Sequence, residues 1–252
     1  MKKIVSIFLI CMLFVSCNSD NDDPPTSVSF NFTHNWDGTN VTNSEFNTIQ
    51  YTNANGQALS IEKLRYLISN ITFRKVNGET TVINAYNLID VTNNTNLIYT
   101  LPNEMLTGHY INVSFTFGFN NDDNYQNYTD LNSASWNVPA QLGGGYHFMQ
   151  LEGKFIDNAS AQTGYAYHCI RAVDNSGAQQ VFQDTFFTVD LGEVELKNNA
   201  SIVINMNIAE WFKNPNQWDL NLLGNMLMPN FNAQVMMHDN GQNVFSLGEL
   251  IP

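Results

Sequence analysis

The chain has 252 residues, of which 43% are hydrophobic and 12% aromatic, so it can bury the core of a large globular domain. Ten Lys and Arg residues against 23 Asp and Glu residues leave a formal net charge of −13. A surface this acidic repels nucleic acid and anionic lipid and attracts cations, so nucleic acid is excluded as an expected partner.

The N-terminus has the pattern of a secretory signal. A short basic start precedes an apolar run over residues 4–15, which is shorter than the roughly 20 residues that a membrane-spanning helix needs. Ser16 and Cys17 then resemble a bacterial lipobox, in which the cysteine is lipidated before cleavage; an ordinary signal peptide is the alternative. We expect residues 1–16 to be a lipoprotein signal peptide and lipid chains on Cys17 to anchor the mature protein to a membrane.

Residues 17–26 are polar, acidic and interrupted by prolines, so they are predicted to be a tether between the membrane and the domain. An acidic run in this position resembles an export signal of some Gram-negative bacteria; a plain solvated linker is the alternative. The expected location is the outer membrane, on its periplasmic or cell-surface face. Cys11 leaves with the signal and Cys17 carries lipid, so Cys169 has no partner for a disulfide within one mature chain.

The remaining residues, 27–252, are expected to form one domain of strands and turns. Residues 27–34 alternate strictly between apolar and polar side chains, and Asn77-Gly78 is a tight-turn pair in a hairpin over residues 72–83. Further strands are predicted at residues 111–119, 147–155, 165–172, 182–191, 202–208, 231–237 and 244–247. Short helices are predicted only at residues 61–68 and 208–212. This pattern predicts an all-β fold, an antiparallel β-sandwich with one or two short helices.

Enzymatic motifs are missing from the sequence, so we do not expect an enzyme. There is no serine elbow, zinc-protease motif, phosphate-binding glycine loop or dinucleotide fingerprint. Cys169 follows His168, but neighbours along a strand point to opposite faces, which favours a buried structural thiol over a nucleophile. Glu152 has no second carboxylate at a readable spacing to support acid–base hydrolysis.

Histidines are the scarce residues that could bind a metal, because a neutral imidazole is a good ligand for copper or zinc. His34 continues the apolar face of its strand; a hydrogen-bonded histidine at the edge of the core is the alternative. His238 follows Met236 and Met237, a soft combination that suits Cu(I), although methionines beside a strand usually belong to the core. The histidines of the chain are His34, His109, His147, His168 and His238.

A series of motifs, in order along nearly the whole domain, resembles the MbnP-like copper-binding proteins, a family of extracytoplasmic β proteins often found as lipoproteins. The resemblance runs from about Val28 to Leu247. The motifs are Phe30-x-Phe32-x-His34, the run from Leu64 to Ile71, Leu88-Ile89-Asp90, Gly108-x-Tyr110, Phe115-x-Phe117-Gly118, Trp136 followed by Gly145-Tyr146-x-Phe148-x-x-Leu151-Glu152-Gly153, then His168 and Asn243-Val244-Phe245.

The resemblance implies that histidines from separate strands hold copper. The opening histidine of the family pattern falls on His34 and the histidine after the Leu-Glu-Gly strand falls on His168, with His147 or His238 as a candidate third ligand. In some members of the family a tryptophan is oxidised to kynurenine and completes the site. Trp36 is the nearest candidate for that modification.

Two functions from different classes follow. The first is a lipid-anchored extracytoplasmic protein that captures or holds copper, with the copper ion, the membrane and an unidentified envelope protein as partners. The second is a cell-surface module without metal that binds a glycan or a protein partner through stacked aromatic rings, although these rings could equally belong to the core. The aromatic residues considered for this surface are Tyr125, Tyr128, Trp136, Trp211 and Trp218.

Overall fold

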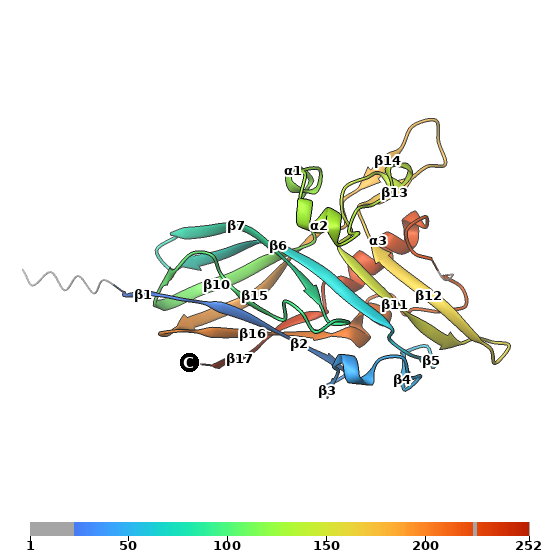
Figure 1. The fold of residues 1–252 in the computed structure, drawn as a ribbon, viewed down its shortest axis with the longest axis horizontal. Helices are drawn as coiled ribbons and strands as arrows, with labels where there is room; N and C mark the ends of the chain where they lie inside the picture. The colour runs from blue at the N-terminus through green and yellow to red at the C-terminus, as the bar shows by residue number, and fades with distance from the viewer. Residues whose placement is uncertain (1–22, 224–225, 252) are drawn as a thin grey trace, which may run out of the picture.

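The computed structural model describes residues 23–223 and 226–251, which form a sandwich of two β-sheets (Figure 1). The predicted signal peptide, the lipidation site Cys17 and most of the predicted tether lie outside the described residues. Within these ranges no helix is long and apolar enough to cross a membrane.

The larger sheet has eight strands arranged around β6 (Lys63–Lys75). β7 (Thr80–Asp90) pairs along one edge of β6. The other edge is shared, because β10 (Gly108–Phe117) pairs with the C-terminal half of β6 and β11 (Met149–Ile156) with its N-terminal end. The remaining strands of this sheet are β4 (Tyr51–Thr52), β5 (Ala58–Leu59), β12 (Gln162–Cys169) and β15 (Phe187–Leu196).

The smaller sheet has five strands, and one of its pairings is parallel. β2 pairs in parallel with β16, whereas the other pairings between named strands of both sheets are antiparallel. An antiparallel sandwich is therefore confirmed apart from this one ladder. The strands are β2 (Ser29–Trp36), β3 (Thr39–Asn40), β8 (Ile98–Thr100), β16 (Ser201–Asn207) and β17 (Phe245–Ile251).

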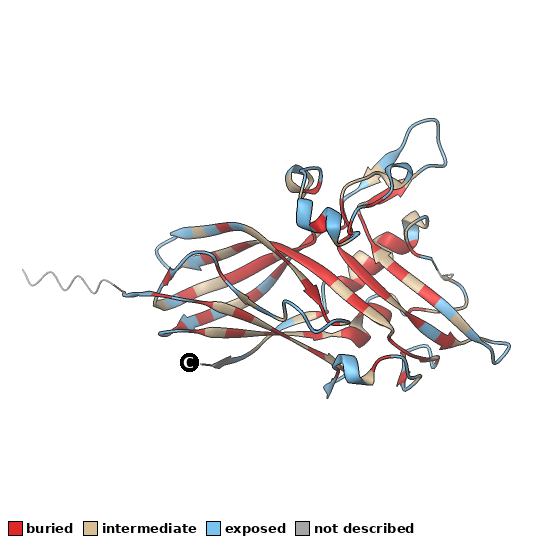
Figure 2. Ribbon diagram, in the orientation of Figure 1, coloured by how far each residue is buried: buried red, intermediate tan, exposed pale blue. Residues whose placement is uncertain are grey.

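The core lies between the two sheets and consists largely of aromatic rings. Alternate residues of β2 are buried, as the sequence predicts, and Phe30 packs against Phe73 and Phe115 of the larger sheet with ring centroids 6.4 and 6.5 Å apart. Figure 2 shows the buried residues as bands along the strands that face one another. The buried side chains form one hydrophobic cluster that includes residues of both sheets.

Short helices and two-stranded ribbons complete the described part of the chain. The α-helices are three rather than one or two, and a 3-10 helix at residues 208–212 confirms the helix predicted there. The elements are α1 (Asn121–Asn124), α2 (Thr129–Ser133), α3 (Phe231–Gly241), η1 (Asn43–Glu45), η2 (Ala140–Leu142), η3 (Ile208–Phe212), β1 (Pro25–Thr26), β9 (Met105–Leu106), β13 (Ala172–Asp174) and β14 (Val181–Gln183).

The helix predicted at residues 61–68 is wrong, because this segment forms the start of strand β6. A bulge explains the error: Asn70 has φ 49°, and the register with β7 shifts between Ser69 and Ile71. One extra residue moves the inward-facing positions from even numbers before the bulge to odd numbers after it. The apolar pattern therefore loses the simple alternation of a strand.

The strand predicted at residues 231–237 is also wrong, because the segment belongs to helix α3. The side chain of Asn230 caps this helix by accepting a hydrogen bond from the Ala233 amide at 3.0 Å. The buried positions are spaced for a helix, and they are Ala233, Gln234, Met237, Asn240 and Gly241.

The last residues of the predicted tether, 17–26, already contact the domain. Pro25 and Thr26 form β1, which pairs with β9, and Thr26 is 2% exposed. Asp23 forms an ion pair with Lys75 at 3.3 Å. The last residues of the predicted tether are therefore packed against the sandwich.

Candidate metal centre

His34 lies in the core between the two sheets and is 4% exposed. Its Nε2 is 3.0 Å from the hydroxyl of Tyr66, and the two rings meet edge to face. Burial lowers the pKa of His34 to about 4 and raises the pKa of Tyr66 well above its usual value. At neutral pH both groups are uncharged, and Nε2 of His34 is already engaged in a hydrogen bond with the Tyr66 hydroxyl.

His168 lies on the opposite face of the larger sheet from His34. Gln150 of β11 stands opposite both Arg65 of β6 and His168 of β12, so these three side chains share a face. Tyr66 follows Arg65 along β6 and therefore points to the other face, where it meets His34. The structure does not bring together the two histidines that the family pattern selects as ligands.

The structure instead brings His168 together with His147, the candidate third ligand. The two rings are nearly perpendicular, at 84°, with centroids 5.1 Å apart. His147 stands just before β11 and is 4% exposed, whereas the His168 side chain on β12 is 17% exposed. Pairing of β11 with β12 explains how residues separated by 21 positions in the sequence become neighbours.

Hydrogen bonds fix which nitrogen of each ring carries the proton. Nδ1 of His147 is 2.8 Å from the Trp136 carbonyl oxygen, which can only accept, so Nδ1 donates and Nε2 keeps its lone pair. Nε2 of His168 is 2.8 Å from Oε1 of Glu152. This hydrogen bond and the contact with Lys63 hold the pKa of Glu152 at about 2, so the carboxylate accepts the Nε2 proton. In the neutral form of His168 the lone pair then lies on Nδ1.

Both remaining lone pairs are buried without a partner. Nε2 of His147 and Nδ1 of His168 make no hydrogen bond within the described residues. Burial, reinforced by the nearby His168 and Arg65, lowers the pKa of His147 to about 4 against the opposing effect of the Trp136 carbonyl. A neutral imidazole with a lone pair that is not used in a hydrogen bond is the form that binds a metal ion. The donor set of this pair therefore fits copper.

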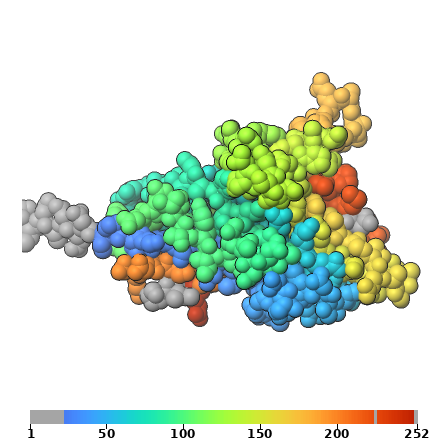
Figure 3. Space-filling view, viewed as in Figure 1, coloured from blue at the N-terminus to red at the C-terminus, as the bar shows by residue number. Residues whose placement is uncertain are grey.

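Trp136 and Arg65 form the wall of the pair. The fully buried indole of Trp136 has its centroid 5.6 Å from that of His147, and its Nε1 has no hydrogen-bond partner. The Arg65 guanidinium lies 4.9 Å from the indole centroid and forms an ion pair with Asp90 at 3.2 Å. In the space-filling view the segment from α1 to η2, which contains Trp136, stands as a raised yellow-green mass beside β6 (Figure 3).

The other predicted site residues lie in separate surroundings. On α3, Nδ1 of His238 is 3.1 Å from Asp239 Oδ1, and its ring meets Phe187. Trp36 stacks on Tyr51 with centroids 4.8 Å apart, so Trp136 rather than Trp36 is the tryptophan beside the imidazole pair. Across the described ranges, no three His, Cys, Asp or Glu side chains are grouped to hold a metal ion.

Cys169 is buried, and desolvation raises the pKa of its thiol. The thiol therefore stays protonated and is a poor nucleophile, in agreement with the predicted structural role. Cys169 stands opposite Met149, one position along from the pair formed by His168 and Gln150, so it points away from the imidazoles.

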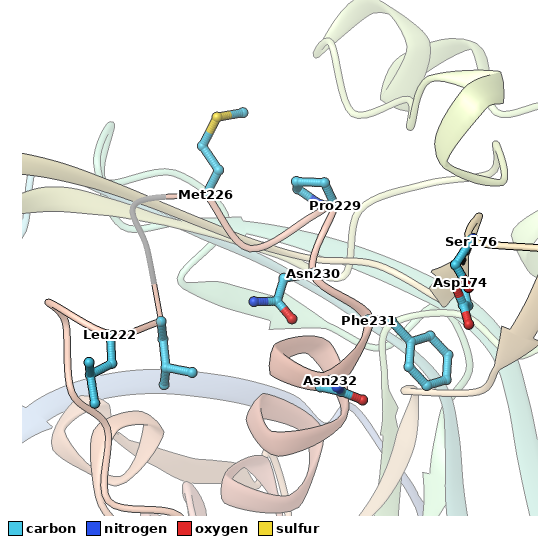
Figure 4. A pocket seen from close by; sticks show the side chains of 9 residues that line it. Asp174, Ser176, Leu222, Met226, Pro229, Asn230, Phe231 and Asn232 are labelled. Carbon is cyan, nitrogen blue, oxygen red and sulfur yellow. Dashed lines mark hydrogen bonds between the residues drawn. The ribbon is translucent and has the colours of Figure 1, made fainter.

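The aromatic surface considered for a glycan does not form as expected. Trp136, Trp211 and Trp218 are 0% exposed, and only Tyr125 of the five rings is strongly exposed, at 48%. A surface pocket lies elsewhere, beside the start of α3, where Phe231 stands near Asp174 and Ser176 (Figure 4). Its lining contains one carboxylate and no imidazole; the residues are Asp174, Ser176, Leu222, Leu223, Met226, Pro229, Asn230, Phe231 and Asn232.

Sequence reasoning did not identify Trp136 and Glu152 as neighbours of the metal candidates. Both belong to the most specific stretch of the family pattern, which contained the signal. Their contacts are with a main-chain carbonyl and a side chain of another strand, and neither contact follows from spacing along the chain.

Comparison with known proteins identifies the family and supports the fold. The sequence profile of the MbnP family matches residues 25–237. Among solved structures, MbnP from Methylosinus trichosporium is similar in fold, with a TM-score of 0.54 and 13% sequence identity over 89% of this chain and 99% of that one. Comparison with curated proteins gives no match. Because the family profile covers most of the chain, the protein belongs to the MbnP family.

Proposed function

We propose that this protein binds a single copper ion outside the cytoplasm, with Nε2 of His147 and Nδ1 of His168 as its imidazole ligands. The observation that carries the proposal is the pair of buried ring nitrogens without hydrogen-bond partners in adjacent side chains. Buried polar atoms normally have a partner, so two orphans on neighbouring rings favour an absent ligand that accepts lone pairs.

The small number of ligands favours Cu(I). Structural zinc requires four protein ligands in a tetrahedron, and no third His, Cys, Asp or Glu joins the pair in the described part of the chain. Imidazole is a good copper ligand, and two of them satisfy the low coordination that Cu(I) accepts. The flanking positive charges are each paired with a carboxylate, Arg65 with Asp90 and Lys63 with Glu152.

Trp136 is the proposed position for the tryptophan modification that the family resemblance implies. Its ring lies against His147 and its carbonyl holds Nδ1 of that residue.

The mature protein is proposed to bind copper rather than to catalyse a reaction, as a lipoprotein of the outer membrane anchored through Cys17. Cys17→Ala should move the folded domain from the membrane fraction to the soluble fraction; retention in the pellet would contradict the anchor.

Titration of Cu(I) into metal-free protein without a histidine tag, in the presence of a chelating competitor, tests the metal site. The wild-type protein should take up a single equivalent. His147→Ala and His168→Ala should each lose most of the affinity, because a single imidazole competes poorly with buffer and chelator. The double variant should bind Cu(I) only slightly more weakly than either single variant, since the two rings act as a unit.

His109→Ala is the matched control, because the exposed side chain of His109 on β10 lies near Glu195 and should not affect uptake. Stoichiometric Cu(I) binding that survives in both His147→Ala and His168→Ala would overturn the proposed site. Intact mass of protein isolated from its native envelope, followed by peptide mapping, tests whether Trp136 is modified.

A further inference from the structure

We propose that Glu152 is a positioning residue of the imidazole pair: its carboxylate orients His168 and makes Nδ1 a stronger donor to the metal. This inference rests on the proposed function and adds a residue that does not itself contact the ion. It starts from the 2.8 Å contact between Glu152 Oε1 and His168 Nε2, on the side of the ring away from the unpaired Nδ1.

The sheet places Glu152 where it can do this. Glu152 stands two residues after Gln150, and Gln150 is directly opposite His168 in the ladder between β11 and β12. Residues two apart on a strand share a face, so Glu152 is the diagonal neighbour of His168 and within reach of its ring. A residue one position earlier or later would point to the core.

Lys63 holds the carboxylate in place. Its Nζ lies 2.7 Å from the same Oε1 atom that accepts the proton of His168, and Lys63 stands opposite Glu152 in the ladder between β6 and β11. Glu152 therefore accepts hydrogen bonds from Lys63 and His168, which lie on the strands at either side of β11.

An anionic acceptor behind a metal-binding imidazole has two physical effects. It prevents rotation of the ring, so that Nδ1 keeps a fixed direction, and it draws the Nε2 proton toward the carboxylate, which increases electron density at Nδ1. Partners of this kind typically change metal affinity by about 10- to 100-fold. His147 has only a neutral carbonyl in the equivalent position, so the two rings are held by acceptors of different strength.

The same face of the sheet offers a matched control. Glu62 and Lys154 form an ion pair at 3.2 Å with side chains about as exposed as those of Glu152 and Lys63. Glu62→Gln removes the same charge from the same sheet without a contact to His168. Any difference between the Glu152 and Glu62 variants therefore reports the contact with the ring and not the loss of overall negative charge.

The experiment measures Cu(I) dissociation constants for Glu152→Leu, Glu152→Gln and Glu62→Gln by chelator competition. Glu152→Leu removes both acceptor and charge and should bind Cu(I) about 10- to 100-fold more weakly than wild type. Glu152→Gln retains an oxygen acceptor, so its Cu(I) affinity should lie between those of wild type and Glu152→Leu. Glu62→Gln should remain within about threefold of wild type, as expected for a screened surface charge.

Nitrogen-15 NMR of the metal-free protein supplies a readout that a purely structural role would not change. In wild type the Nε2 proton of His168 should be visible and shifted downfield, in Glu152→Gln visible but less shifted, and in Glu152→Leu lost to solvent exchange. Circular dichroism and unfolding curves confirm that each variant is folded.

Equal Cu(I) affinities for the Glu152 variants and Glu62→Gln, with normal uptake by wild type, would overturn the role of Glu152 and leave the proposed function standing. A wild-type His168 without a proton on Nε2 would do the same. Failure of wild type to take up Cu(I) would overturn both.

Discussion

The two faces of the larger sheet hold imidazoles that are alike in burial and opposite in chemistry. His34 and His147 are each 4% exposed, and burial lowers the pKa of each to about 4. Nε2 of His34 meets the Tyr66 hydroxyl, whereas Nε2 of His147 meets no hydrogen-bond partner in the described structure. Burial alone therefore does not distinguish these two imidazoles; the unmatched lone pair does.

The difference has an energetic meaning. A buried polar atom without a partner costs about 1–3 kcal/mol relative to one that is hydrogen-bonded. The pair formed by His147 and His168 contains two such atoms on neighbouring rings, so a ligand that accepts both lone pairs would recover that cost. The core around His34 has no comparable cost at Nε2, and this histidine stabilises the fold.

The largest expected effect is metal-induced stabilisation on one face only. At a free Cu(I) concentration about 1,000 times the dissociation constant, binding to the native state adds about 4 kcal/mol to the free energy of unfolding. This increment should appear in wild type and in His34→Gln, and should vanish in His168→Ala. Thermal unfolding with and without Cu(I) measures it. Loss of the increment in His34→Gln would place His34 in the metal site after all.

The next effect concerns the metal-free protein. Here the loss of unfolding free energy should be larger for the variant at His34 than for the variant at His147. His34→Ala leaves a cavity and an unpartnered Tyr66 hydroxyl in the core, so we expect a loss of about 2–4 kcal/mol in the free energy of unfolding. His147→Ala also leaves a cavity, but it removes an atom that already lacks a partner, and the Trp136 carbonyl keeps its hydrogen bond from the His147 amide. The loss should therefore be smaller than that of His34→Ala, by about 1–2 kcal/mol. Urea unfolding curves measure both, and equal losses would contradict the distinction.

A smaller effect should follow pH. Because the folded-state pKa of His34 is lowered from 6.5 to about 4, the unfolded chain gains its proton first as the pH falls. The contribution of His34 to stability is complete above pH 6.5 and declines from there to about pH 4, with about 2 kcal/mol lost between pH 7 and pH 5. His34→Phe cannot titrate and should show a shallower decline by that amount in metal-free unfolding curves. An unchanged slope would mean that His34 has the same pKa in the folded and unfolded chain.

The smallest expected effect is on the unfolding free energy when helix α3, which contacts the main chain at His168, loses its N-terminal cap. Gln234 of this helix donates to the His168 carbonyl at 2.7 Å and accepts from the Ile170 amide at 3.2 Å, and Asn230 caps the helix. Asn230→Ala should cost about 1 kcal/mol in unfolding free energy, and Asn230→Asp should restore most of it. The titration of His34 should be unchanged in both variants. A change there would show that the two faces are coupled.

Local patterns allowed much of the fold to be predicted. The strict alternation around Phe30 and the Asn77-Gly78 turn depend on neighbours in sequence, and both features were confirmed. The order of motifs along the chain was enough to indicate the family. Prediction failed at Asn70, where a bulge reverses the parity of β6, and at residues 231–237, where an asparagine cap and helical burial replaced the expected strand.

The sequence by itself determined which residue types could bind a metal: five imidazoles in an acidic β protein, with His147 and His168 among the candidates. Only the tertiary structure decided which of them meet. A single step along β6, from Arg65 to Tyr66, separates the face of His168 from the face of His34, and the pairing of β11 with β12 brings His147 and Glu152 to His168. The physical reason is that strand pairing fixes sidedness and hydrogen bonds fix the protonated nitrogen, and both depend on residues distant in the chain.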